Sequence, residues 1–146
     1  IRQVLAFEAK EKKTDVSLAI EYFNNVMKKR TICFVLSDFI SQEFEKPLKI
    51  ASKKHDIIAL RIHDKRENTL PNVGIIPLQD AENDSISYVD TSSQKVRELF
   101  YNKQEEKQTY LRKLFPKCGV DMIDISTGSD YVKPLMNFFK NRGKRR

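Results

Sequence analysis

Hydrophobic residues along the chain follow a helical period in some segments and form unbroken runs in others. The first clear segment repeats apolar residues at helical spacing: Val16, Ala19, Ile20, Phe23 and Met27. This spacing predicts an amphipathic helix that opens at Thr14-Asp15. Residues 31–37 are instead apolar and β-branched without alternation, and the run ends in Ser37 and Asp38. Such a run predicts a central strand of a sheet that is covered on both faces.

The rest of the chain continues this succession of helices and strands. In order, we expect a helix from about Lys46 to Lys54, strands at 56–62, 74–78 and 85–89, a long polar helix from Ser92 or Ser93 to 117, a strand at 120–126 and a closing helix at 130–139. The two short strands in the middle predict a small β-hairpin or edge excursion. The strand–helix–strand order predicts an α/β fold with parallel strands flanked by helices.

The bulk composition is that of one globular domain. The 146 residues are 40% hydrophobic and 32% charged, which is enough apolar material for a core. No run approaches the roughly 18 apolar residues of a membrane span, and no secretory signal opens the chain. Two cysteines without motif spacing, Cys33 and Cys118, suit a reducing compartment, so we expect a cytoplasmic location. Residues 1–7 have the pattern of the end of an amphipathic helix, which predicts a piece of a longer protein.

Positive charge is concentrated in the last seven residues. The formal net charge is +7, and five positive charges come from the tail: Lys140, Arg142, Lys144, Arg145 and Arg146. The remainder of the chain is therefore nearly balanced. A short basic tail is more often a solubilising terminus than a nucleic-acid contact, so we do not expect nucleic acid as the partner.

Polar residues follow three of the predicted parallel strands, at 37–38, 63–64 and 126–127. The carboxyl ends of parallel strands meet at one edge, where open α/β sheets bind their ligands. Thr14 joins this edge because it precedes the helix that leads into the first strand. A hydroxyl and a carboxylate, those of Thr14 and Asp38, suit a hard divalent cation. The alternative is structural, since Thr14 can cap its helix and Asp38 can bond the turn that follows.

The order and spacing of several short segments carry a resemblance to a known family. The segments are Leu5-Ala6-Phe7-Glu8, Ala19-Ile20-Glu21-Tyr22, Val35-Leu36-Ser37-Asp38-Phe39, Lys54-His55-Asp56, Leu70-Pro71-Asn72-Val73-Gly74, Val89-Asp90-Thr91-Ser92-Ser93, Cys118-Gly119-Val120-Asp121 and Asp130-Tyr131-Val132. Together they resemble the second half of a von Willebrand factor A-like domain and, more narrowly, the bacterial family named domain of unknown function 58. The resemblance implies a Rossmann-like open sheet, with residues 1–146 as the C-terminal part of a single domain truncated on its N-terminal side.

The same resemblance implies a metal-ion-dependent adhesion site, in which Mg²⁺ is held by an Asp-x-Ser-x-Ser turn, a Thr and an Asp. Thr14 matches the Thr and Asp38 the Asp, and Asp15, Ser37 and Asp64 would form the rim of the site. No Asp-x-Ser-x-Ser occurs in these residues. Since Mg²⁺ needs near-octahedral oxygen ligands, we expect Mg²⁺ in the full-length protein and little or none in this chain.

Three kinds of function compete for the Asp38 edge. The resemblance favours a non-enzymatic protein-interaction module whose partner is a MoxR-type AAA ATPase. The alternative is a phosphoacceptor or hydrolase-like α/β domain in which Asp38 is the nucleophile, with Asp64 and Lys65 as the nearest companions. A metal-dependent nuclease would need an Asp-x-Asp pair, which Asp38-Phe39-Ile40 does not supply.

A sheet that lacks its first strands leaves one edge without a neighbour. Such an edge exposes backbone N–H and C=O groups that can pair with another chain. We therefore expect the chain to form a homo-oligomer, or to exchange elements between copies, through that edge.

Overall fold

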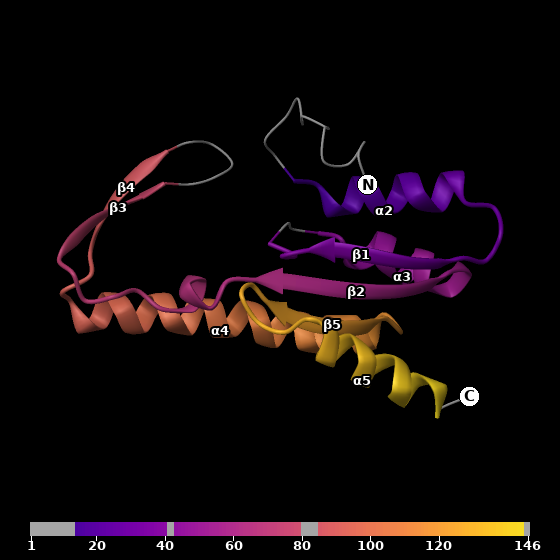
Figure 1. The fold of residues 1–146 in the computed structure, drawn as a ribbon. Coiled ribbons are helices and arrows are strands. Elements are labelled where there is room, and N and C mark those ends of the chain that lie inside the picture. Colours follow the sequence, from indigo (N-terminus) through magenta and orange to yellow (C-terminus); the bar gives the residue numbers. More distant parts are fainter. Residues whose placement is uncertain (1–13, 41–42, 80–84, 145–146) are drawn as a thin grey trace, which may run out of the picture.

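The computed structural model describes residues 14–40, 43–79 and 85–144. In chain order the elements are α2 (Val16–Val26), β1 (Ile32–Ser37), α3 (Glu45–Lys54), β2 (Asp56–His63), the 3₁₀ helix η1 (Lys65–Asn68), β3 (Ile75–Gln79), β4 (Ile86–Asp90), α4 (Gln94–Lys117), β5 (Asp121–Ser126) and α5 (Val132–Gly143) (Figure 1). This order confirms the predicted succession of helices and strands. The helix expected at residues 1–7 lies outside the described residues. Within the described ranges, no helix is long and apolar enough to cross a membrane.

β1, β2 and β5 form a parallel sheet in the order β1-β2-β5. The register places Ala59 of β2 between Val35 of β1 and Met122 of β5. β2 is the central strand, and its residues from Ile57 to Arg61 are all buried. The parallel sheet flanked by helices confirms the predicted α/β class, and β5 is an edge strand of the sheet that the described residues form.

The prediction that the β1 segment is a central strand covered on both faces is wrong. Among the described residues, β1 pairs with β2 alone. Cys33 and Val35 pack against the core, whereas Ile32, Phe34 and Leu36 on the opposite face are 59%, 45% and 61% exposed. An unbroken apolar run indicates two apolar faces, but the neighbouring elements decide whether both are covered.

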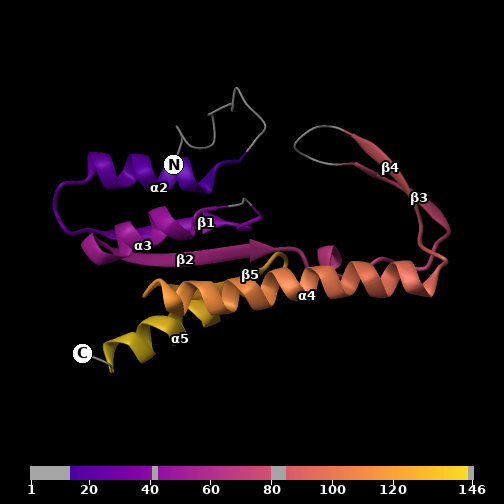
Figure 2. The same ribbon diagram turned by 180° about the vertical axis from the view of Figure 1, so that it is seen from behind.

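Helices cover the two faces of the sheet unequally. α3 and α4 lie on one face with α2 packed against α3, while α5 lies on the other face (Figures 1 and 2). The main core lies under α3 and α4 and includes three phenylalanine rings, Phe39, Phe44 and Phe115, whose centroids are 4.9–6.2 Å apart. A smaller cluster around Ile58 and Ile123 lies under α5.

The β3–β4 hairpin stands away from the sheet, at the N-terminal end of the long helix α4 (Figure 1). Its strands are antiparallel, with Pro77 opposite Tyr88, which confirms the predicted hairpin. Thr91 is fully buried, and its hydroxyl and backbone N–H both donate to the Gly74 carbonyl, at 2.6 and 2.8 Å. Arg97 of α4 donates to the Thr91 carbonyl at 2.6 Å, so the hairpin base is bonded to the helix.

Proline and glycine mark helix ends as the sequence indicates. Pro47 lies in the first turn of α3, where its missing N–H breaks no helical bond. After α4, Gly119 has a φ of +69°, the left-handed conformation that ends helices and that glycine adopts at low cost.

Apolar spacing predicts Val132, Leu135, Met136 and Phe139 on the inner face of the closing helix, and this prediction is correct only for Leu135. Leu135 and Phe138 pack against the sheet, whereas Val132, Met136 and Phe139 are 47%, 66% and 47% exposed. The two inward residues are three positions apart, so α5 contacts the sheet along a narrow stripe.

One residue of the basic tail has a structural role. Arg142 pairs with Asp56 at the start of β2, and its Nε lies 3.4 Å from Asp121 Oδ2 at the start of β5. The guanidinium also lies 5.5 Å from the centre of the Phe138 ring. The end of α5 is thereby tied to both strands, and Arg142 is not part of a free terminus.

Candidate functional site

The carboxyl ends of β1, β2 and β5 meet at one end of the sheet, as predicted. The strands are parallel neighbours, and the Thr127 N–H after β5 donates to the His63 carbonyl of β2 at 2.9 Å. The first turn of α2 lies at the same end in both ribbon views (Figures 1 and 2). The fold therefore gathers at this end the polar segments that the sequence singles out.

Asp38 is exposed and folds back on its own turn. Its Oδ1 accepts a hydrogen bond from the Ile40 N–H at 3.1 Å and a longer one from the Ser37 hydroxyl at 3.4 Å. Ser37 Oγ in turn accepts from the Phe39 N–H at 3.0 Å. Phe39 has a φ of +56°, uncommon for a residue with a Cβ, and its ring enters the core. Asp38 thus makes the structural bond that the sequence analysis offered as its alternative role.

Thr14 and Asp15 both lie at the start of α2 but differ in what they contact. Asp15 is the N-cap, because its Oδ1 accepts from the Leu18 N–H at 2.9 Å. Thr14 is exposed, and no hydrogen bond or ion pair joins it to Asp38 in the part of the chain that the structure describes. The helix cap predicted for Thr14 is therefore formed by its neighbour.

Asp64 holds the turn between β2 and η1. Its Oδ1 accepts from the Arg66 N–H at 2.8 Å. This backbone bond, together with a hydrogen bond from the Thr127 side chain and the positive charge of Arg66, lowers the pKa of Asp64. Since Thr127 follows β5, Asp64 also links the ends of two strands.

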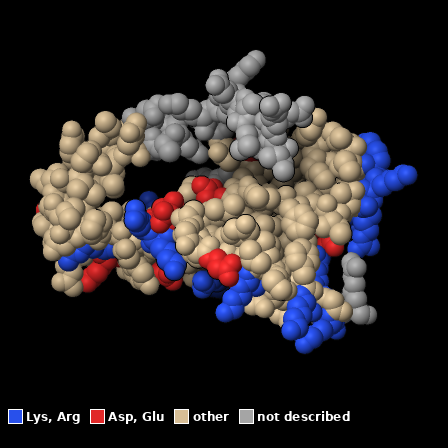
Figure 3. Space-filling model, in the orientation of Figure 1, with Lys and Arg blue, Asp and Glu red and all other residues tan. Residues whose placement is uncertain are grey.

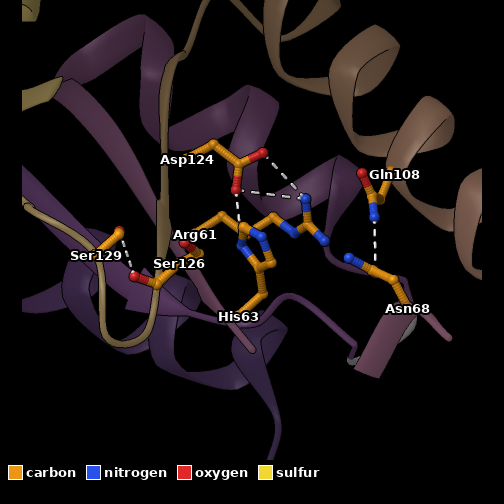
Figure 4. A network of polar contacts seen from close by, with 7 residues as sticks. All are labelled: Arg61, His63, Asn68, Gln108, Asp124, Ser126 and Ser129. Atoms are coloured by element: carbon orange, nitrogen blue, oxygen red, sulfur yellow. Dashed lines mark hydrogen bonds and ion pairs between the residues drawn. The ribbon is translucent and has the colours of Figure 1, made fainter. Parts of the chain in front are cut away.

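A partly buried network of charged and polar side chains, not foreseen from the sequence, lies beside this edge (Figure 4). Arg61 of β2 is opposite Asp124 of β5, and its Nη1 lies 3.2 Å from Oδ2 and 3.4 Å from Oδ1 of that carboxylate. His63 Nδ1 lies 2.9 Å from Asp124 Oδ1, a close contact without hydrogen-bond angles. Arg61 is only 7% exposed. The network therefore forms a polar end to the main core.

Charged residues within the apolar runs of two strands indicate this network in the sequence. Arg61 interrupts the apolar run of β2, and Asp124 interrupts that of β5. A charged residue inside a buried run needs a partner of opposite charge, because an unpaired buried charge is costly. Matching the two required the register between the strands, which the sequence does not contain.

A pocket of about 320 Å³ opens beside the network, between the turn after β1 and helix α4. Phe39, Phe44 and Leu111 are buried residues that form its apolar walls. Arg61 and the exposed Asp38 also line it. This volume is at the lower end of the range for small-ligand sites.

The residues present do not fit a metal ion by themselves. In residues 14–40, 43–79 and 85–144, no three His, Cys, Asp or Glu side chains are grouped closely enough to hold one. Asp38 has one carboxylate oxygen already bonded to the Ile40 N–H, and Mg²⁺ needs several oxygen ligands in near-octahedral geometry. Cys33 and Cys118 are free thiols, and burial raises the pKa of both, which disfavours the thiolate that metals bind.

Comparison with known proteins gives one family and several relatives. The family model described as protein of unknown function DUF58 matches residues 1–110. Uncharacterized protein MAV169 of Mycobacterium avium is 24% identical over 129 residues, which cover 88% of this chain and 76% of that protein. Uncharacterized proteins Mb1516 of Mycobacterium bovis and Rv1480 of Mycobacterium tuberculosis are each 23% identical over 129 residues, 88% of this chain and 40% of theirs. The chain thus spans less than half the length of these last two relatives. No solved structure matches it.

Proposed function

The chain belongs to the family described as protein of unknown function DUF58, and from this premise we propose that it is a non-enzymatic protein-interaction module. In this proposal the fold is a Rossmann-like, von Willebrand factor A-like domain, and the interaction surface is the end of the sheet where β1, β2 and β5 finish. The observation that supports it most is the common position of Asp38 and the start of α2 at that end (Figure 1). Thr14 and Asp38 would be a partial metal-ion-dependent adhesion site.

The surroundings of Asp38 favour binding over nucleophilic catalysis. A phosphoacceptor needs companion acids and a lysine beside its aspartate. Lys65, the nearest candidate in the sequence, has no bond to Asp38 within the described residues. Asp38 is also committed to its own turn through the Ile40 N–H. These features suit an exposed carboxylate that contributes to a contact surface.

The proposed partner of the full-length protein is a MoxR-type AAA ATPase, and its proposed cofactor is Mg²⁺. Thr14 and Asp38 supply two oxygen donors, so Mg²⁺ would require further ligands from an upstream Asp-x-Ser-x-Ser turn. The chain described here is therefore expected to bind little or no Mg²⁺.

The proposal is tested by measuring binding of a purified MoxR-type ATPase to the full-length protein in Mg²⁺ and in EDTA. We expect EDTA and Asp38→Ala each to weaken binding at least tenfold, because both remove part of the proposed contact. Glu21→Ala, a change at an exposed position of α2, is the matched control and should bind like the parent. Equal binding by Asp38→Ala and Glu21→Ala would contradict the proposal.

Labelling with acetyl phosphate separates the proposal from its enzymatic alternative. Because Asp38 lacks the companions of a phosphoacceptor, intact-mass analysis should show no phosphoryl adduct on the chain. An adduct that is lost in Asp38→Asn would instead establish the phosphoacceptor function.

A further inference from the structure

The pocket beside β2 contains hydrogen-bond donors for which the described chain offers no acceptor. Of the three guanidinium nitrogens of Arg61, only Nη1 contacts Asp124. Arg61 Nε is buried without a partner, and no bond is made by Nη2 within the described ranges. A buried donor without an acceptor is costly, and an arginine that is 7% exposed has little access to water. These unused donors indicate that the pocket takes an acceptor from outside the described residues, with a small shift of the guanidinium that brings the inaccessible Nε to the pocket surface.

The geometry of the free donors selects the kind of acceptor. Nε and Nη2 lie along one edge of the planar guanidinium, with parallel N–H bonds that match the two oxygens of a carboxylate. Asn68 of η1 accepts a hydrogen bond from Gln108 at 2.9 Å through Oδ1, which fixes its amide. Figure 4 shows the amide nitrogen of Asn68 turned toward the guanidinium of Arg61. Arg61 and Asn68 both line the pocket, so β2 and η1 each bring hydrogen-bond donors to its wall.

The walls of the pocket favour an oxyanion that carries an organic group. Phe39, Phe44 and Leu111 are 5%, 2% and 5% exposed and line the 320 Å³ space next to Arg61. Aromatic and aliphatic walls of this kind gain from removing apolar surface from water. An inorganic anion has no apolar surface to bury against these walls.

Charged residues on the pocket wall oppose a dianion more than a monoanion. The exposed carboxylates of Asp38, Glu43 and Glu67 also line the pocket, against the single exposed ammonium of Lys107. Coulomb repulsion scales with ligand charge, so this wall opposes a phosphate dianion about twice as strongly as a carboxylate.

We propose that this pocket binds a monocarboxylate carried on an apolar or aromatic body. The carboxylate lies on the Nε–Nη2 edge of Arg61, and the body packs against Phe39 and Phe44. The proposal rests on the proposed function only in placing a ligand at the interaction end of the sheet, and it requires neither Mg²⁺ nor Thr14. A free organic acid and the terminal carboxylate of a polypeptide share this chemistry.

The test is a titration of the ¹⁵N-labelled chain in EDTA, followed through the Nε–H resonance of Arg61. Phenylacetate should shift this resonance saturably. Phenylacetamide, which has the same ring without the charge, and acetate, which has the charge without the ring, should each bind at least tenfold more weakly. No saturable shift with phenylacetate, or phenylacetamide or phenyl phosphate binding as tightly, would overturn the proposal.

Two variants and a control locate the site. Arg61→Lys keeps the charge but removes the two-donor edge, and should weaken phenylacetate binding at least tenfold. Gln104→Trp should fill the pocket from the side of α4 and weaken binding to the same extent. Because it leaves the Arg61–Asp124 pair intact, this variant tests the site even if Arg61→Lys does not fold. Arg112→Gln, on the exposed side of α4, is the matched control. Binding to Gln104→Trp with the affinity of the parent would place the ligand elsewhere and overturn the assignment.

A last comparison distinguishes the two sources of the carboxylate. A tripeptide ending in phenylalanine should bind more tightly than phenylacetate if the natural ligand is a polypeptide terminus, and more weakly if it is a free acid. In either case its C-terminal amide should lose binding. Because these titrations contain no ATPase and no Mg²⁺, their outcome is independent of the partner-binding experiment.

Discussion

Two acidic residues, Asp64 and Asp90, accept hydrogen bonds from backbone N–H groups in the turns where they lie. Asp64 accepts from the Arg66 N–H, and Asp90 accepts from both the hydroxyl and the N–H of Ser92, at 2.5 and 2.9 Å. These bonds favour the ionised carboxylates, so they lower the pKa of Asp64 and of Asp90. The stability of the turn that follows β2 is therefore expected to depend on pH.

We predict that Asp64→Asn reduces the sensitivity of the protein to acid. A carboxylate whose pKa is lowered in the folded state stabilises above its unfolded pKa of about 4, and this contribution is lost as the pH falls through the folded value. The melting temperature of the parent should therefore fall between about pH 5 and pH 2, and less steeply in Asp64→Asn, whose amide oxygen can still accept the cap bond. Glu21→Gln on α2 is the control. Identical slopes for Asp64→Asn and the parent would contradict this account.

Among the elements, α5 is attached to the sheet by few contacts. Leu135 and Phe138 are its packed apolar residues, and Arg142 binds the first residues of β2 and β5, Asp56 and Asp121. The side chains of Arg142 and Asp56 are only 25% and 15% exposed, so their pair is screened less than a surface ion pair. The docking of this helix therefore depends strongly on one charged residue.

We predict that Arg142→Ala lowers the free energy of unfolding by about 1–2 kcal/mol, because it removes one partly buried ion pair with Asp56 and a second with Asp121. Urea denaturation followed by circular dichroism measures the change. Lys140→Ala, at an exposed position of the same helix, should change it by less than about 0.5 kcal/mol. Equal effects of the two substitutions would show that the ion pairs do not hold α5.

At the scale of the whole molecule, one face of the sheet is only partly covered. Ile32 and Phe34 of β1 lie near the exposed Phe139 of α5, with the rings of Phe34 and Phe139 6.2 Å apart, and Leu36 is exposed on the same face of β1. Figure 3 shows a broad area of uncharged residues over this side of the molecule. A strand paired on one side with an apolar exposed face is a site for association with another chain.

We predict that the chain self-associates through β1, whose outer edge pairs with no other strand among the described residues. Light scattering after size-exclusion chromatography should show a mass above 17.1 kDa that rises with concentration. Lysines on an edge strand oppose such pairing, so Phe34→Lys with Leu36→Lys should give a monomer. Tyr22→Lys, at a 70% exposed position of α2, should not change the mass of the assembly. A parent that is monomeric at every concentration would contradict the prediction.

Much of the fold could be predicted because the signals are local. Pro47 and Gly119 constrain backbone angles through their own covalent structure, and the apolar period of α2 follows from helical geometry alone. The position of Asp38 at a strand end also follows from the pattern, since the apolar run stops there. The turn bond made by its side chain was predicted for the same reason, because donor and acceptor are two residues apart.

Other features depend on which distant segments meet. The apolar run of β1 did not reveal that one of its faces is exposed, because coverage depends on where α5 packs. The Arg61–Asp124 pair joins residues 63 positions apart, and only the register between β2 and β5 sets them opposite each other. The pocket beside Arg61 requires in addition that α4 and the turn after β1 close over the same point. The sequence alone thus determined the elements, their order and the polar strand ends, because these follow from covalent geometry and local periodicity. The tertiary structure decided which faces are covered, which charges pair and where a ligand can enter, because these depend on contacts between segments far apart in the chain.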